Sequence, residues 1–129
     1  MSDLAKRAIA CKGWRWMPGM SVNGMVVVDA DESGLEVVRK GTVQDWPLEY
    51  AYPDLTDPAT LGCLLALVRA AWRGSAVPAH VQAQPNVRGG IFWVCFAGDR
   101  ATYRPTEAEA LVAALEAAEG REVTDERLP

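Results

Sequence analysis

The sequence of 129 residues predicts an α+β fold, in which one antiparallel β-sheet of about four to five strands packs with two main helices and a short N-terminal helix. Two Ala/Leu-rich segments, at 57–73 and 106–119, have apolar residues at helical spacing behind a residue that suits a helix cap. Runs rich in valine and aromatic residues lie before them and are bounded by turn residues. The resulting order of helix, strands, helix, strands and helix favours antiparallel strands covered by helices.

The N-terminal helix is predicted at residues 3–11. Asp3 can cap its first turn, small and apolar residues make one side, and Gly13 can end it. The segment GWRWMPGM at 13–20 follows, and we expect it to be a loop dense in large side chains.

The next segments are predicted to be extended. Residues 22–30 contain the run MVVV, the turn DESG occupies 31–34, and 35–39 form the returning strand. A further extended segment is expected at 42–52. Pro47 inside it favours an edge position or a bulge, because proline has no N–H to donate to a sheet.

The main helix is predicted at 57–73, with Asp57 as its cap, Pro58 at its first position and Gly74 near its end. Its apolar face follows the spacing i, i+3, i+4, i+7 and i+11. The residues of this face are Leu61, Leu64, Leu65, Val68 and Trp72, widened by Cys63, Leu67 and Ala71. We expect Leu65 to lie in the core.

Two or three strands are predicted after this helix. They are expected at 77–84, at IFWVCF (91–96) and at 101–104, with a tight turn at Gly98-Asp99 between the last two. The middle run is apolar at consecutive positions, which predicts a central strand that is apolar on both faces.

The second main helix begins with a capping box, because Thr106 can cap the first turn and Glu109 lies three residues further on. The residues of its buried stripe are expected to be Ala108, Leu111, Val112, Leu115 and Ala118. Gly120 is expected to end the helix. We therefore predict a single α+β domain at 1–120 and a polar C-terminal tail at 121–129.

Composition excludes several classes of protein. Half of the residues are hydrophobic and 23% are charged, as in a globular domain, and the chain is long enough to fold without disulfides or a metal. The net charge of −4 argues against a protein whose whole surface binds nucleic acid. The charge is unevenly spread, however. A basic N-terminus and an acidic stretch at 107–129 can face different partners or pair with each other.

Three cysteines without CxxC spacing are typical of a reduced cytosolic protein. Cys63 and Cys95 are predicted to be core thiols, and Cys11 to be more exposed. The first ten residues are too polar for a signal peptide, and no apolar run approaches the ~20 residues that span a bilayer. We therefore predict an intracellular protein that does not bind a membrane.

No arrangement of residues indicates catalysis, a metal site or a cofactor. His80 is the single histidine, and no acidic pair lies near it in the sequence, so it indicates neither a zinc site nor a triad. Gly89 and Gly90 lead into a strand, whereas a phosphate-binding loop leads into a helix, so we expect a hairpin turn. The acidic residues at 29–32 lack the later glutamate of a calcium-binding loop. We predict that the protein is not an enzyme.

The best candidate surface is the segment 12–20 with the helix before it. Aromatic and cationic side chains alternate there, and such side chains stack on bases or nucleotides, or anchor a protein interface. The alternative is that the indole rings cover the core. The candidate binding residues are Arg7, Lys12, Trp14, Arg15, Trp16 and Trp46.

Three segments together resemble a known group of proteins: KGWRWMPGM at 12–20, LTDPATLGCLLALVRAAW at 55–72 and PTEAEALVAALEAA at 105–118. They are similar to small proteins of tailed phages and prophages, and to the phage ABA-sandwich type of domain, in which a sheet lies between helices. The resemblance covers about a third of the chain and brings no catalytic residues with it. It implies a phage-encoded protein in the host cytoplasm, of a kind that often acts by binding.

Several functions remain open from the sequence. The first is an accessory protein that binds a host target, such as a component of antiviral defence, or sequesters a signalling nucleotide. The second is a nucleic-acid accessory factor, and others are a virion or assembly component and a small enzyme with a site near His80. A symmetric homodimer is a further alternative, through the tryptophan loop or through a strand edge near Pro47.

Overall fold

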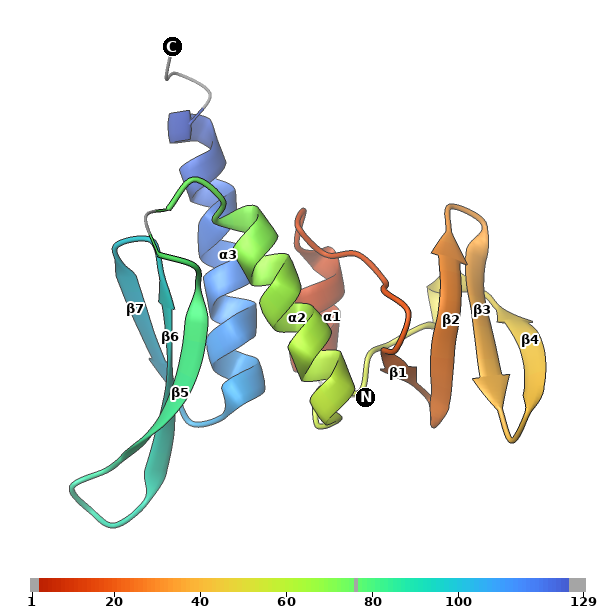
Figure 1. Cartoon of the computed structure of the whole chain (residues 1–129), viewed down its shortest axis with the longest axis horizontal. Coiled ribbons are helices and arrows are strands. Elements are labelled where there is room, and N and C mark those ends of the chain that lie inside the picture. Colours follow the sequence, from red (N-terminus) through yellow and green to blue (C-terminus); the bar gives the residue numbers. More distant parts are fainter. Residues whose placement is uncertain (1–2, 76, 126–129) are drawn as a thin grey trace.

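The computed structural model of the chain describes residues 3–75 and 77–125, and it confirms the α+β class. The helices are α1 (Asp3–Ala10), α2 (Pro58–Ala71) and α3 (Glu107–Asp125), with a short 3-10 helix η1 (Leu48–Tyr50). Figure 1 shows two sheets at opposite ends of the molecule, with the three helices between them. No helix within the described ranges is long and apolar enough to cross a membrane.

The strands form two antiparallel sheets, whereas the sequence predicted one. The first sheet contains β1 (Ser21–Val22), β2 (Met25–Asp31), β3 (Gly34–Arg39) and β4 (Thr42–Trp46), and the second sheet contains β5 (His80–Pro85), β6 (Ile91–Ala97) and β7 (Arg100–Arg104). Neighbours in each sheet are neighbours in the chain. The α2 helix separates the two groups of strands along the chain, and the helical layer occupies the space between them. Their edges therefore cannot exchange hydrogen bonds.

The strand β4 lies at an edge of the first sheet, as the sequence predicted, but it ends directly before Pro47. The extended segment does not continue to residue 52. Instead, the Tyr50 N–H donates to the Pro47 carbonyl (3.2 Å) and the Ala51 N–H to the Leu48 carbonyl (3.1 Å), which makes the 3-10 turn. A proline cannot donate to a ladder, so the chain turns where the strand would otherwise extend.

The N-terminus of α2 confirms its predicted cap. The Asp57 carboxylate accepts the Thr60 N–H at 2.9 Å, and Pro58 occupies the first turn. The buried stripe comprises Thr60, Leu64, Leu67 and Val68. Leu65 is only partly buried, so the prediction that it lies in the core was wrong. The helix packs against α3 and β5, and this packing rotates the buried stripe away from Leu65.

The helix α3 lies between the second sheet and the other two helices, and it contacts α1, α2 and all three strands of that sheet. Thr106 caps it, since its hydroxyl oxygen accepts the Glu109 N–H at 3.1 Å. The predicted end at Gly120 was wrong, because the helix continues to Asp125. A glycine inside a helix costs about 1 kcal/mol and does not by itself stop it. Of the predicted tail, residues 121–125 belong to α3 and 126–129 lie outside the described residues.

A single cluster of buried side chains runs through both ends of the molecule. The first sheet contributes Met25, Val27, Leu35 and Val37 on one face, and irregular segments cover them with Met20, Ala51 and Leu55. The second sheet contributes Cys95 and Ala97, which lie against the helices. The two sheets are therefore covered by different kinds of structure, loops in one case and helices in the other.

A buried hydroxyl joins the two ends. Thr60 is fully buried, and its hydroxyl oxygen accepts the Ser21 N–H at 2.8 Å while it donates to the Asp57 carboxylate at 2.9 Å. The Ser21 carbonyl in turn accepts the Asp54 N–H at 3.0 Å. The first strand of the first sheet is thus hydrogen-bonded to the first turn of α2.

Candidate functional site

The two tryptophans of the predicted binding loop pack inward. Trp14 and Trp16 form an edge-to-face pair with ring centroids 5.3 Å apart, and both rings are partly buried against the hydrophobic core. The Trp14 indole N–H is buried and has no hydrogen-bond partner among the described residues. Arg15 between them is exposed. The loop therefore has the arrangement in which indole rings cover the core, one of the two alternatives that the sequence left open.

The side chain of Arg7 and the backbone of Lys12, which lie next to this loop, are hydrogen-bonded to α3. The Arg7 guanidinium donates twice to the Glu116 carboxylate, at 2.6 and 3.1 Å, and the backbone N–H of Lys12 donates to Glu119 at 2.7 Å. The hydrogen bond from Arg7 lowers the pKa of Glu116 and raises that of Arg7. The basic N-terminus and the acidic C-terminal helix thus pair with each other, which leaves Arg7 less free to bind an anion.

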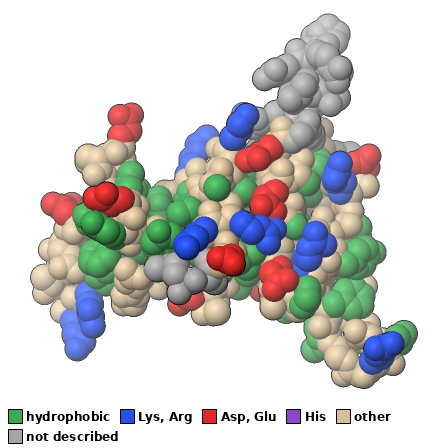
Figure 2. Space-filling view, turned by 180° about the vertical axis from the view of Figure 1, so that it is seen from behind, with side chains coloured by type: hydrophobic (Ala, Val, Ile, Leu, Met, Phe, Trp, Pro, Cys, Tyr) green, Lys and Arg blue, Asp and Glu red, His purple; other side chains and the backbone are tan. Residues whose placement is uncertain are grey.

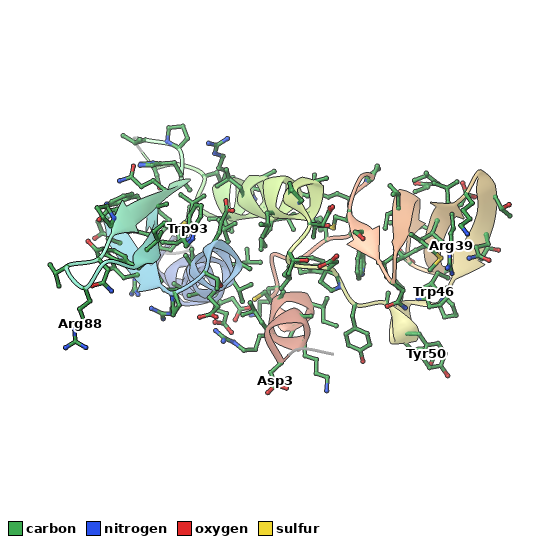
Figure 3. The ribbon with its side chains drawn as sticks, turned by 90° about the horizontal axis from the view of Figure 1, so that it is seen from below. Asp3, Arg39, Trp46, Tyr50, Arg88 and Trp93 are labelled. Atoms are coloured by element: carbon green, nitrogen blue, oxygen red, sulfur yellow. The ribbon has the colours of Figure 1, made fainter. Side chains whose placement is uncertain are left out.

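Trp46 lies on the first sheet, at the end of β4 (Figure 3). Its indole N–H donates to the Tyr50 carbonyl at 3.1 Å. It shares no cavity or ring contact with the 12–16 loop among the described residues. Instead, it lines a cavity of about 320 Å³ whose carboxylates are those of Asp29, Asp31, Glu36 and Asp45.

These carboxylates do not form a metal centre. No group of three or more potential ligands in the described part of the chain is placed to hold a metal ion. The Asp31 carboxylate accepts hydrogen bonds from the Ser33 hydroxyl (2.6 Å) and the Ser33 N–H (2.8 Å) within its own turn. These bonds lower the pKa of Asp31. Residues 31–34 therefore build a turn, as the sequence indicated, and Asp29 lies in the strand β2 before it.

The thiols differ from expectation in their exposure. Cys95 is buried as predicted, but Cys11 is also buried and Cys63 is only partly buried. Burial raises the pKa of both Cys11 and Cys95 to about 11. Because a thiol reacts as its thiolate, these two groups are poor nucleophiles near neutral pH. Cys11 follows α1 and packs into the hydrophobic core, where its thiol donates to the Arg7 carbonyl at 3.3 Å.

The second sheet has one face that no helix covers (Figure 1). In antiparallel pairs, residues directly opposite each other point to the same face. His80 is opposite Phe96, Gln82 and Tyr103 are both opposite Val94, and Gln84 is opposite Phe92. The alternate residues of β6 lie against the helices instead. We call the first set, His80, Gln82, Gln84, Phe92, Phe96 and Tyr103 around Val94, the open face.

Aromatic rings dominate the open face. The His80 and Phe96 rings are stacked with centroids 5.0 Å apart, and the Phe92 and Tyr103 rings are tilted with centroids 5.6 Å apart. Tyr103 is 53% exposed. Val94 is fully buried although it lies outside the main hydrophobic cluster, so the side chains of the open face itself must shield it. The result is a pre-packed aromatic surface.

The charge around the open face is positive. The three strands contain no aspartate or glutamate, and Arg88 lies in the hairpin before β6. Arg100 and Arg104 lie at the two ends of the edge strand β7, opposite Ala97 and Trp93, so their side chains start from the face that the helices cover. Figure 3 shows Arg88 projecting outward from that hairpin. Seen from behind, green hydrophobic surface and blue cations lie close together at this end of the molecule (Figure 2). The open face therefore has aromatic rings on its surface, with Arg88 beyond one end and two arginines along the edge strand beside it.

Sequence reasoning missed the open face because it interpreted IFWVCF as a central strand that is apolar on both faces and did not ask which face is covered. The signal lay on the neighbouring strand, where polar residues alternate in HVQAQP. A partner strand with His80, Gln82 and Gln84 at every second position indicates that one face meets water. Reading the two strands as a pair would have identified it.

No protein-family model matches the chain, and comparison with curated proteins and with solved structures gives no match either. The resemblance to phage proteins therefore stays a prediction. The chemistry of the open face is the basis on which a function can be proposed.

Proposed function

We propose that the protein is a small accessory protein that acts by binding rather than by catalysis, and that the open face is its recognition surface. The observation that carries this proposal is a sheet face that exposes aromatic rings and is covered by no other element. Aromatic side chains and arginines are enriched where proteins bind partners, because they offer large contact areas with few rotatable bonds.

The resemblance of three sequence segments to phage proteins supports the further proposal that the chain is phage-encoded and acts in the host cytoplasm. Two classes of partner are consistent with this role. One is a host protein, such as a component of antiviral defence, and the other is a nucleic acid. The open face presents groups that stack and form hydrogen bonds, which both classes of partner use.

The test is a comparative capture from a bacterial lysate with three tagged chains. These are the wild type, the variant Phe92→Ala/Tyr103→Ala on the open face, and the control variant Val43→Ala on the first sheet. Val43 is 57% exposed and Tyr103 is 53% exposed, so the two positions are matched in exposure. Captured proteins, nucleic acids and small molecules would be identified by mass spectrometry and sequencing, after melting curves establish that all three chains are folded.

We expect the wild type and Val43→Ala to retain the same partner and the double variant to lose it. A partner retained by all three chains would place recognition elsewhere on the molecule. Failure of the folded wild type to capture anything would remove the support for an accessory binding role.

A further inference from the structure

We propose that the ligand of the open face is single-stranded nucleic acid, with bases stacked on Phe92, on Tyr103 and on the stacked His80–Phe96 pair, and with phosphates next to the arginines at the ends of the sheet. This inference rests on the proposed function and names the partner class. It relocates the nucleic-acid hypothesis from the tryptophan loop, whose rings pack on the core, to the second sheet.

The spacing of the rings suits consecutive bases. Phe92 and Phe96 lie four residues apart on β6, which places their Cα atoms about 13 Å apart at the usual rise of a strand. Tyr103 is opposite Val94, midway between them on β7. Sheets that bind single strands use aromatic residues in this way to stack two or three bases. Every base has a ring face, so such stacking tolerates different sequences.

A hollow at one end of the open face offers a binding site for one base. It has a volume of about 420 Å³ and lies beside the Phe92 and Tyr103 rings, with Arg104 and Asn86 also lining it. The ring walls offer stacking, while an amide and a guanidinium offer hydrogen bonds to a base edge or a phosphate. The Arg104 guanidinium donates to the Tyr103 carbonyl at 2.7 Å.

Polar groups for base edges run alongside the rings. Gln82 and Gln84 lie on β5 opposite Val94 and Phe92, on the same face. Each amide offers both a donor and an acceptor, which is the combination that base edges require. His80 adds an imidazole at the other end, where its ring already stacks on Phe96.

Two arginines lie at opposite ends of the second sheet. Arg88 lies in the hairpin before β6 and Arg100 at the opposite end of the sheet, next to the turn after β6. Asp99 in that turn is the one acidic residue between 77 and 105, although the whole chain carries a net charge of −4. Local positive charge on an acidic protein favours a phosphate backbone that follows the open face and disfavours binding over the rest of the surface.

A protein partner or a second copy fits this face less well. A face of three strands has an outline of roughly 14 Å by 20 Å, which is about 300 Å² in projection. A stable protein interface needs about 800 Å² from each side. In addition, Val94 at its centre is already fully buried, so that a protein partner would gain little from covering it. What remains accessible is ring surface and hydrogen-bonding groups.

The experiment measures the binding of labelled oligothymidylate and oligouridylate of about ten nucleotides by fluorescence anisotropy, at low and at physiological salt. A duplex of the same length is the competitor. The protein variants are Tyr103→Ala and Tyr103→Phe on the open face, with Val43→Ala as the control on the first sheet. Arg100→Gln is compared with Arg39→Gln, since Arg39 is an exposed arginine on the first sheet.

We expect Tyr103→Ala to weaken binding of the single strands about ten- to a hundredfold through the loss of one stacked base. Tyr103→Phe and Val43→Ala should stay within about twofold of the wild type. Arg100→Gln should lower the slope of log affinity against log salt concentration by about 0.7, and Arg39→Gln should leave the slope unchanged.

The inference is wrong if the folded wild type binds no single strand at low salt, or if Tyr103→Ala and Val43→Ala bind equally well. In either case, a partner from the lysate that is still lost by Phe92→Ala/Tyr103→Ala would leave the proposed function intact and identify a protein as the ligand. If the wild type self-associates and Tyr103→Ala abolishes this association, the ligand of the open face is a second copy of the chain and not a nucleic acid.

Discussion

The two sheets are built from similar hairpins but present opposite chemistry. The strands of the first sheet contain four carboxylates, Asp29, Asp31, Glu36 and Asp45, and the strands of the second contain none. The outer face of the first sheet shows paired valines, whereas that of the second shows aromatic rings. The covering layers also differ, with loops over the first sheet and two helices over the second.

This difference shows that burial constrains the residue types on only one face of each sheet. The inner faces of both sheets carry small and aliphatic residues, because they meet a single hydrophobic cluster. The outer faces contribute little to that cluster and are free to differ. The comparison predicts that the helical layer dominates stability and that the second sheet dominates recognition.

The largest expected effect tests the two covering layers. Leu64 in the helix α2 is fully buried, and Leu35 in the first sheet is 2% exposed. Truncation of a buried leucine costs about 2–5 kcal/mol of the free energy of unfolding, and the cost is higher where neighbours cannot close the cavity. We expect Leu64→Ala near the upper end of this range and Leu35→Ala near the lower end, as measured by denaturant unfolding. Equal costs would show that loops and helices confine their cores equally.

The next comparison uses one turn glycine from each sheet. Gly98 and Gly41 both have positive φ, +61° and +82°. A Cβ at Gly98 would lie 2.9 Å from the Trp72 ring, whereas a Cβ at Gly41 would meet nothing within 4 Å. Left-handed backbone costs an alanine about 1–2 kcal/mol, so Gly41→Ala should show this cost alone. Gly98→Ala should add about 1–3 kcal/mol of overpacking. Thermal unfolding of both variants measures these losses of stability. Equal losses would show that the Trp72 ring does not lie against Gly98.

A smaller effect tests the link between the two ends. Thr60→Val keeps the shape of the side chain but removes the hydroxyl that accepts the Ser21 N–H. A buried donor left without a partner costs about 1–3 kcal/mol. Thr60→Ser keeps the hydroxyl and serves as the control. We expect amide hydrogen exchange in β1 and β2 to accelerate in Thr60→Val more than in Thr60→Ser, while exchange in the second sheet stays unchanged. A uniform acceleration would mean that both sheets open together.

The smallest expected effect concerns the Arg7–Glu116 pair. Its side chains are 49% and 38% exposed, and exposed pairs contribute only about 0.2–1 kcal/mol. The hydrogen bond from Arg7 lowers the pKa of Glu116, so the stabilisation is present above the ordinary glutamate pKa of about 4.3 and is lost as the pH falls through the lower, folded value. Glu116→Gln should therefore be slightly less stable than the wild type at neutral pH and indistinguishable from it in strong acid.

The Arg7–Glu116 pair also predicts which of the two candidate surfaces binds nucleic acid. Arg7 was a candidate binding residue from the sequence, but its guanidinium is already bonded to α3. We expect Arg7→Gln to leave the affinity for single-stranded oligonucleotides unchanged, in contrast to Arg100→Gln. A loss of affinity in Arg7→Gln would return the nucleic-acid surface to the N-terminal segment.

Local features of the fold were predictable. The cap of α2 by Asp57, the cap of α3 by Thr106 and the edge position of β4 before Pro47 all depend on residues within a few positions of each other. The candidate site was not predictable in the same way. Trp14 and Trp16 alternate with cations in the sequence, but contacts with the distant core decide where their rings lie.

The sequence by itself determined the α+β class, the positions of the helices and turns, and the residues that can stack or carry charge. Capping, turn conformation and hydrophobic periodicity act over one or two turns of chain, so they can be read locally. Only the tertiary structure decided that the strands form two sheets, that Arg7 pairs with Glu116, and that one face of the second sheet stays uncovered. These outcomes depend on which segments far apart in the chain pack together, and the helical layer settles that by covering one face of the second sheet and separating it from the first.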